Sequence, residues 1–142
     1  MGIIFVPNAF AEITISDDAT GGDCATIGTW DSASRTCTFT SDLTEQVTVG
    51  ANSLTLDGNG HTLDGQGNCS EGTVYGIHFN ARTTLVIKNF IIKNFCDGMN
   101  FTNSVSNSIL DNTITNNYRE GIDIENSNDN IISNNVITNN AR

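Results

Sequence analysis

Six polar side chains form three pairs that are spaced 22 and 23 residues apart along the chain. In order, the pairs are His78 and Asn80, Asn100 and Thr102, and Asp123 and Glu125. They alternate with apolar residues, as on strands with one buried and one exposed face. Histidine and carboxylate groups can transfer protons, whereas a regular polar row can hydrogen-bond the hydroxyls of a polymeric sugar. The residue types favour a plain solvated surface, with a glycan-binding face as the first functional alternative and a catalytic row as the second.

Direct catalysis by this row meets a geometric obstacle. If the three stretches are neighbouring parallel strands, each lies about 4.8 Å from the next, and His78 and Asp123 are about 10 Å apart. That separation is too large for a direct proton transfer. The row is thus better suited to binding than to acid–base chemistry.

Metal ligation is the second kind of chemistry that the residue types suggest. Asp17, Asp18 and Asp23 form an acidic cluster that could attract calcium, although their spacing matches no known calcium loop. The four cysteines contain no Cys-x-x-Cys pair, and both histidines are far from them in sequence, which argues against zinc. We expect no bound cofactor, with calcium at the acidic cluster as the alternative.

The beginning of the chain favours export. Residues 1–11 combine an apolar stretch with an Ala-x-Ala motif directly before Glu12, as at a signal-peptidase site. They predict the remnant of a secretory signal, and an apolar first strand is the alternative. The expected location is therefore secreted, periplasmic or at the cell surface.

Export places the four cysteines in an oxidising compartment, where disulfides form. Cys24 and Cys37 flank a segment with the Gly and Asp-Ser turn signals of a hairpin, so we expect them to pair. Cys69 and Cys96 then pair by elimination. Residues 12–42, which contain the hairpin, are expected to cap the first coil of the fold.

A repeat of 22–23 residues predicts the fold. Residues 76–97, 98–120 and 121–142 each begin with a glycine and an alternating strand, and the segment before them contains less regular strands. A fixed period of this length indicates a solenoid. A leucine-rich repeat would need leucines at successive core positions, whereas these strands are rich in β-branched isoleucine. We predict an all-β, right-handed parallel β-helix whose coils span residues 43–142.

Asparagine recurs at two positions of each regular coil. Aligning Val86, Ile109 and Ile132 every 23 residues places the asparagines of successive coils above one another. A side-chain amide both donates and accepts hydrogen bonds, so stacked asparagines can form a ladder at a corner of the helix. The predicted ladders consist of Asn89, Asn112 and Asn135, and of Asn94, Asn117 and Asn140.

Segment 54–63 has the sequence Leu-Thr-Leu-Asp-Gly-Asn-Gly-His-Thr-Leu and precedes coils of the form Asn-x-Ile-x-x-Asn. With these motifs, residues 12–142 resemble the NosD-like family of right-handed parallel β-helices, which shares the pectin-lyase-like superfold. The Cys-x₁₂-Cys hairpin is similar to the cap of archaeal and bacterial surface proteins of this kind. The resemblance implies carbohydrate binding or a sugar-hydrolase-like activity, and a link to copper. The sequence, however, has no cluster of Met, Cys or His that would hold copper.

The enzymes of this superfold use side-chain sets that we do not find. Pectate lyases need an acidic calcium cluster with an arginine base, and polygalacturonases need carboxylates at close range. Alginate epimerases carry an Asp-Pro-His-Glu motif, and the single proline here is Pro7. We therefore predict a non-catalytic module with a structural role at the cell surface or envelope and the capacity to bind a glycan. The alternatives are the N-terminal part of a polysaccharide lyase, hydrolase or epimerase, and a self-assembling fibre subunit.

Charge limits the partners of the chain. The net charge is −10, and residues 12–75 hold ten acids against one base, Arg35. An acidic surface repels nucleic acid and anionic lipid, and no stretch after residue 11 approaches the length needed to cross a membrane. The expected partner is a polysaccharide or surface glycan. Self-association is a further expectation, because nothing in the sequence covers the last coil.

Overall fold

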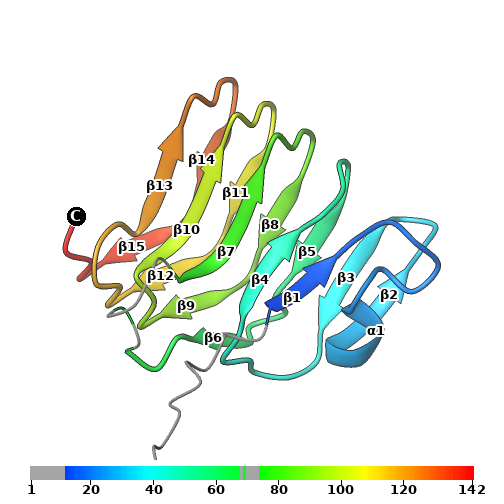
Figure 1. Ribbon diagram of the computed structural model, residues 1–142, viewed down its shortest axis with the longest axis horizontal. Coiled ribbons are helices and arrows are strands. Elements are labelled where there is room, and N and C mark those ends of the chain that lie inside the picture. The colour runs from blue at the N-terminus through cyan, green and yellow to red at the C-terminus, as the bar shows by residue number, and fades with distance from the viewer. Residues whose placement is uncertain (1–11, 68, 70–73) are drawn as a thin grey trace, which may run out of the picture.

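The computed structural model describes residues 12–67, 69 and 74–142 (Figure 1), so the predicted signal remnant lies outside the described residues. Strands in the described residues form three sheets. Sheet A has the order β1 (Glu12–Ile15), β4 (Gln46–Val49), β7 (Tyr75–Asn80), β10 (Asp97–Thr102) and β13 (Ile122–Glu125). Sheet B has the order β14 (Ile131–Ser133), β11 (Ser108–Leu110), β8 (Val86–Lys88), β5 (Thr55–Asp57), β3 (Thr36–Phe39) and β2 (Gly28–Asp31). Sheet C has the order β15 (Val136–Thr138), β12 (Thr113–Thr115), β9 (Ile91–Lys93) and β6 (Thr62–Asp64).

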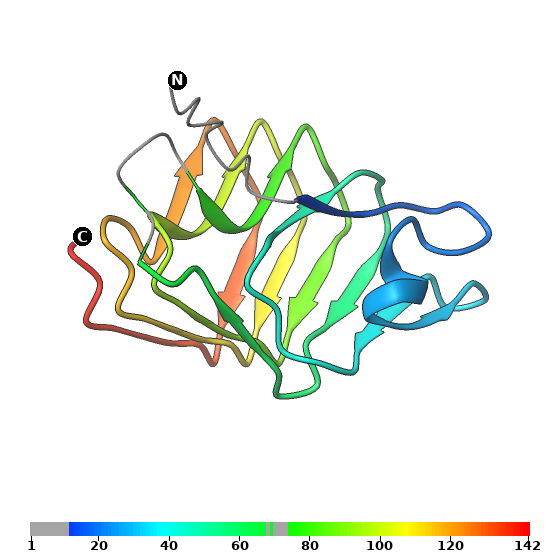
Figure 2. The same ribbon diagram turned by 60° about the horizontal axis from the view of Figure 1, so that its bottom comes forward.

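Each regular coil contributes one strand to each sheet. For example, β7, β8 and β9 follow one another in sequence and lie in sheets A, B and C. Every strand pair is parallel except β2 with β3. Figures 1 and 2 show the coils side by side along one axis. The predicted parallel β-helix is therefore confirmed.

The core consists of apolar columns, in which each side chain lies against the equivalent side chain of the next coil. In sheet A, Val47, Ile77 and Met99 are directly paired and fully buried. Beside them, the rings of Phe79 and Phe101 stack with centroids 4.8 Å apart. This separation equals the ordinary spacing of strands in a sheet, so identical side chains pack without adjusting the backbone.

The register between the first two regular coils differs from the prediction. Ile87 pairs with Ile109, and Ile92 pairs with Ile114, at spacings of 22 residues rather than 23. The alignment of Val86 with Ile109 is therefore wrong. Side chains of a strand alternate between its faces, and Val86 lies on the outer face while Ile87 is buried.

The corrected register removes Asn89 and Asn94 from the predicted ladders. Asn112 still stacks with Asn135, as its amide Nδ2 donates to Asn135 Oδ1 at 3.0 Å. The equivalent bond from Asn117 to Asn140 measures 2.9 Å. In both pairs the backbone N–H of the first asparagine donates to the same Oδ1, so one oxygen satisfies two donors at a corner of the coil.

A third ladder was not predicted. Asn107 Nδ2 and its backbone N–H both donate to Asn130 Oδ1, at 3.0 and 2.9 Å. These two asparagines lie just before β11 and β14, at the corner between sheets A and B. All three corners between the last two regular coils are therefore held by the same amide arrangement.

Phenylalanines occupy the positions at which Asn89 and Asn94 were expected. The backbone N–H groups of Phe90 and Phe95 donate to the ladder oxygens of the next coil, at 3.0 and 3.1 Å. Both rings are buried in the core. In the preceding coil, Gly58 and Gly65 lie against these rings, and a Cβ atom at either glycine would lie 2.5 and 2.6 Å from them, respectively. Glycine is therefore required for these two rings to pack.

The N-terminal end carries the predicted hairpin. The helix α1 (Cys24–Ile27) precedes the antiparallel pair of β2 and β3, and Cys24 is bonded to Cys37. Cys69 is bonded to Cys96, so both expected disulfides are confirmed. Within the expected cap, β1 and β3 pair with β4 and β5 and thus continue sheets A and B. At the opposite end, the inward side chains of Ile124, Ile132 and Ile137 are partly exposed.

The ladder predicts a selective loss of stability. Asn112→Ala removes the amide bonds to Asn135 and to the Ile87 carbonyl, and leaves buried polar groups without partners. We expect the free energy of unfolding to fall by about 1–3 kcal/mol in denaturant titrations. The control is Asn128→Ala, because the Asn128 side chain is exposed. Equal losses in the two variants would contradict the ladder.

Candidate functional site

The six predicted polar residues do come together on sheet A. β10 lies between β7 and β13, and Asn100 pairs in register with His78 on one side and Asp123 on the other. Thr102 pairs in the same way with Asn80 and Glu125. The residues thus form two parallel rows of three across β7, β10 and β13, strands that lie side by side in Figure 1. We call them the His78 row and the Asn80 row.

The His78 row is a continuous hydrogen-bonded chain. His78 Nδ1 lies 3.0 Å from Asn100 Oδ1, and Asn100 Nδ2 donates to Asp123 Oδ2 at 3.0 Å. Asn100 was expected on the exposed face, but only 5 % of its surface is accessible. Its neighbours His78 and Asp123 are partly exposed. The amide therefore connects the histidine and the carboxylate, which do not touch each other.

The Asn80 row is more accessible. The Thr102 hydroxyl and the Asn103 side-chain amide both donate to Asn80 Oδ1, each at 3.0 Å. Asn80 and Glu125 are exposed, and Thr102 is partly buried. This row leaves the amide nitrogen of Asn80 and the carboxylate of Glu125 directed to solvent.

An aromatic side chain beside the rows was not assigned to the site from the sequence. The rings of Tyr75 and His78 stack with centroids 4.9 Å apart and an interplanar angle of 18°. Strict alternation would place Tyr75 on the inner face with Ile77 and Phe79. Gly76 and Ile77 are both buried, so the alternation is interrupted at this point and Tyr75 reaches the outer face. The break after a glycine is the signal that could have indicated it.

A buried ion pair borders the rows. The Asp97 carboxylate accepts two hydrogen bonds from the Arg119 guanidinium and one from the Glu120 backbone N–H. Its side chain is 1 % exposed, whereas that of Arg119 is 39 % exposed. The hydrogen bond to Asp97 raises the pKa of Arg119 above its ordinary value. Because all its bonds are internal, this carboxylate serves to anchor the turn after β12 rather than to act on a ligand.

The acidic cluster near the cap is divided among separate partners. Asp18 accepts hydrogen bonds from Gly22, Thr20 and Ser16, which lower the pKa of its carboxyl, the Gly22 backbone bond having the largest effect. Asp23 accepts from the Thr14 backbone N–H, and Asp17 pairs with Arg35. Each of the three carboxylates that could have held calcium is thus bonded to a different part of the protein.

The other metal-binding residue types are also engaged elsewhere. All four cysteines form disulfides, and Met99 is fully buried in the core. His61 Nδ1 lies 3.1 Å from Asp42, while His78 contacts Asn100 and Tyr75. Across the described residues, no group of three His, Cys, Asp or Glu side chains is placed to hold a metal ion.

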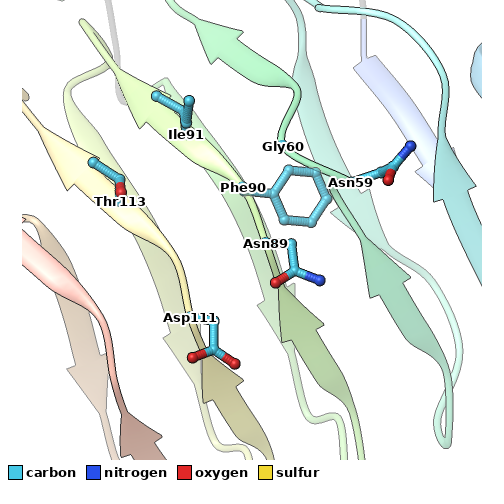
Figure 3. Close-up of a pocket in the computed structure, with 7 residues that line it drawn as sticks. All are labelled: Asn59, Gly60, Asn89, Phe90, Ile91, Asp111 and Thr113. Carbon is cyan, nitrogen blue, oxygen red and sulfur yellow. The ribbon is translucent and has the colours of Figure 1, made fainter.

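A shallow pocket lies at the corner between sheets B and C (Figure 3). It has a volume of about 370 Å³ and is lined by Asn59, Gly60, Asn89, Phe90, Ile91, Asp111 and Thr113. Figure 3 shows the Phe90 ring directed toward the turn at Asn59 and Gly60. The side-chain amide of Asn89, which lines the pocket, already donates to Asp57 Oδ1 at 2.9 Å. The pocket offers separate polar groups on a bent surface, in contrast to the aligned rows of sheet A.

Two carboxylates at the corners of sheet C have shifted pKa values. Partial burial alone would raise the pKa of Asp57, but hydrogen bonds from Asn89, the Asn59 backbone and Lys88 outweigh burial and lower it. The same balance, with bonds from Asn94 and Lys93, lowers the pKa of Asp64. Each carboxylate also forms an ion pair with its lysine, at 3.3 and 3.5 Å. Both corners therefore favour the charged form of the acid.

These shifts predict a loss of stability in acid. Because the folded pKa lies below the ordinary value of 3.8, the unfolded chain takes up protons first as the pH falls. The stabilisation is complete above about pH 5, begins to fall near pH 4, and is lost as the pH falls through the lowered pKa values of the folded chain. Denaturant titrations from pH 6 to pH 2.5 should show a smaller acid-dependent loss for Asp57→Asn/Asp64→Asn than for the unchanged chain. An identical pH dependence of the variant and the unchanged chain would show that Asp57 and Asp64 do not cause this loss of stability.

The Asp97 ion pair predicts an asymmetric response to mutation. Arg119→Met leaves a buried carboxylate with the Glu120 N–H as its remaining donor, and we expect a loss of about 1–3 kcal/mol in unfolding free energy. Asp97→Asn should cost less, because the freed Arg119 side chain is already 39 % exposed and can be hydrated. Denaturant titrations of the two variants measure the difference. A larger loss for Asp97→Asn would contradict this account.

Comparison with known proteins gives one match. Residues 12–142 match the NosD family, which is described as a periplasmic copper-binding protein. No curated protein and no solved structure matches the chain. The periplasmic description confirms the predicted export, and the described residues contain no helix that could span a membrane. The matched segment includes every described strand, and we conclude that the chain belongs to the NosD family.

Proposed function

We propose that this chain is an exported, non-catalytic β-helix module of the cell surface or envelope that binds a glycan on sheet A. The observation that carries the proposal is the alignment of six polar residues in two rows on three successive strands. The rows consist of His78, Asn100 and Asp123, and of Asn80, Thr102 and Glu125. Repetition of polar groups at the strand spacing suits a ligand that is itself a repeating polymer.

The two rows keep free hydrogen-bonding capacity on the outer face. Asp123 uses one carboxylate oxygen for Asn100, and the other is available to a ligand. The Glu125 carboxylate and the Asn80 amide nitrogen are exposed. The Tyr75 and His78 rings form a flat boundary beside these groups. Sugar hydroxyls can donate to such oxygens and accept from such amides, so the face has the chemistry of a glycan-binding surface.

The arrangement of the charged groups supports binding over catalysis. Asn100 separates His78 from Asp123, and an amide does not relay a proton as a carboxylate or imidazole does. The nearby Asp97 carboxylate is buried and fully bonded. Within the described residues, Asp123 is therefore hydrogen-bonded to an amide rather than to a second acid or base, and Asp97 is committed to Arg119.

The described residues do not fit a copper ion. The family description names copper, but the cysteines are oxidised, Met99 is buried among apolar residues and the histidines have other partners. Copper sites combine imidazole, thiolate or thioether groups at one place. Such a set is absent from the described residues. The proposed function therefore rests on the outer face of sheet A and includes no metal.

A glycan array with the purified chain, followed by calorimetry on the best ligand, tests the proposal. We expect Asn80→Ala/Glu125→Ala to weaken binding by about tenfold or more, since each removes an exposed hydrogen-bonding group. The matched control is Thr113→Ala/Thr138→Ala, which removes polar groups from sheet C. Equal effects of the two double variants, or no glycan bound in any form, would refute the proposal.

A further inference from the structure

We infer that the outer face of sheet A selects glycans without acidic groups and excludes polyuronates. The inference rests on the proposed function and names the class of ligand. It follows from the direction of the hydrogen bonds in the His78 row, which determines where the face can accept and where it can donate. The starting point is Asp123, since an ionised carboxylate has no hydrogen to donate.

Asp123 sets the orientation of the Asn100 amide. Because the carboxylate only accepts, the group that faces it at 3.0 Å must be the amide nitrogen of Asn100. The amide oxygen then faces His78 Nδ1, also at 3.0 Å. Asn100 is almost completely buried, so its amide has no freedom to turn toward water. Both the oxygen and the nitrogen of the Asn100 amide therefore already have hydrogen-bond partners within the row.

The orientation of Asn100 in turn selects the tautomer of His78. An amide oxygen only accepts, so His78 Nδ1 must carry the hydrogen. In a neutral imidazole the other nitrogen, Nε2, then has a lone pair and no hydrogen. Stacking on Tyr75 holds the plane of the ring, and Nε2 has no hydrogen-bond partner among the described residues. His78 thus presents an acceptor to a ligand.

The other accessible groups of the face are mostly acceptors too. Asp123 has its second oxygen, and Glu125 is exposed as a carboxylate. Two arginines border this face: Arg119 is bonded to buried Asp97, and Arg82, two residues after Asn80, donates to the Val49 and Ala81 carbonyls. Neither forms an ion pair with Asp123 or Glu125. Asn80 Nδ2 remains as an exposed donor, because Asn80 Oδ1 already accepts two bonds.

This distribution favours ligands that donate. A hydroxyl group can donate to His78 Nε2, Asp123 and Glu125 and can accept from Asn80. A uronate unit would bring its carboxylate against Asp123 and Glu125, and like charges placed together oppose binding. The face therefore fits a polymer of uncharged sugars.

The tautomer can be measured without a ligand. Long-range nitrogen–proton NMR at pH 8, with His61 and His78 distinguished by a His78→Gln variant, should show His78 protonated on Nδ1 and bare on Nε2. In the Asp123→Asn variant, both side chains that flank the Asn100 amide, at positions 78 and 123, can donate or accept a hydrogen bond. We therefore expect a mixture of the two His78 tautomers. Protonation of Nε2 in the unchanged chain would overturn the inference.

Binding at pH 8 tests the ligand class with neutral glucan and mannan oligosaccharides against polygalacturonate and alginate oligosaccharides. We expect a neutral ligand to bind about tenfold more tightly than either uronate. Asp123→Asn/Glu125→Gln should reduce this preference, while Thr113→Ala/Thr138→Ala should keep it. Uronate binding equal to or tighter than neutral binding overturns the inference but leaves glycan binding in place. Absence of binding to both classes overturns the proposed function, while the NMR result still decides the orientation of the row.

Discussion

Stacking of equivalent residues in parallel register is the constraint on which the rest of this structure depends. Each strand can satisfy its backbone only with the strand of the next coil, so every residue lies above its counterpart at the strand spacing. The inward positions become apolar columns such as Ile77 and Met99, and the corners become amide ladders such as Asn112 and Asn135. The outward positions become rows of polar groups by the same rule. Core, corners and candidate site are therefore three results of one geometry.

The repeat was sufficient to predict the fold and the place of the polar rows, because these depend on spacing alone. The disulfides were predicted separately, from the hairpin signals between Cys24 and Cys37 and then by elimination. The register between the first two coils was not predictable from apolar type, since Val86 is as apolar as the buried Ile87. The error moved Asn89 by one position and assigned it to a ladder. The burial of Asn100 was not predictable, because alternation alone places its side chain on the exposed face. The outward turn of Tyr75 accompanies the break in alternation at Gly76, for which the glycine itself is a sequence signal.

The outer face of sheet A illustrates how a solenoid can obtain chemistry from repetition with substitution. The same strand position holds His78, Asn100 and Asp123 in three coils, so three different functional groups are brought into contact without a loop or cleft. The contacts are between neighbours in the stack, and they give the row a direction from carboxylate to imidazole. The family is described by its copper binding, but this chain can belong to it without binding copper. The fold is maintained by the stacked core residues, and metal ligands need not be among them.

The phenylalanine coil also limits how such a protein can lengthen. In a coil that has the ladder asparagines, such as residues 98–120, the amide oxygens accept from the backbone of the preceding coil, and the backbone donates to the same kind of oxygen in the following coil. A duplicate could therefore be inserted beside it with its corners satisfied. The coil of Phe90 and Phe95 cannot be copied in the same way, because its rings need glycines in the coil that precedes it. Coils can thus be added by duplication on the C-terminal side of the phenylalanine coil, but a second phenylalanine coil cannot be added on its N-terminal side. Relatives that differ in length should accordingly differ in the number of asparagine coils, with a single phenylalanine coil next to the coil that carries Gly58 and Gly65.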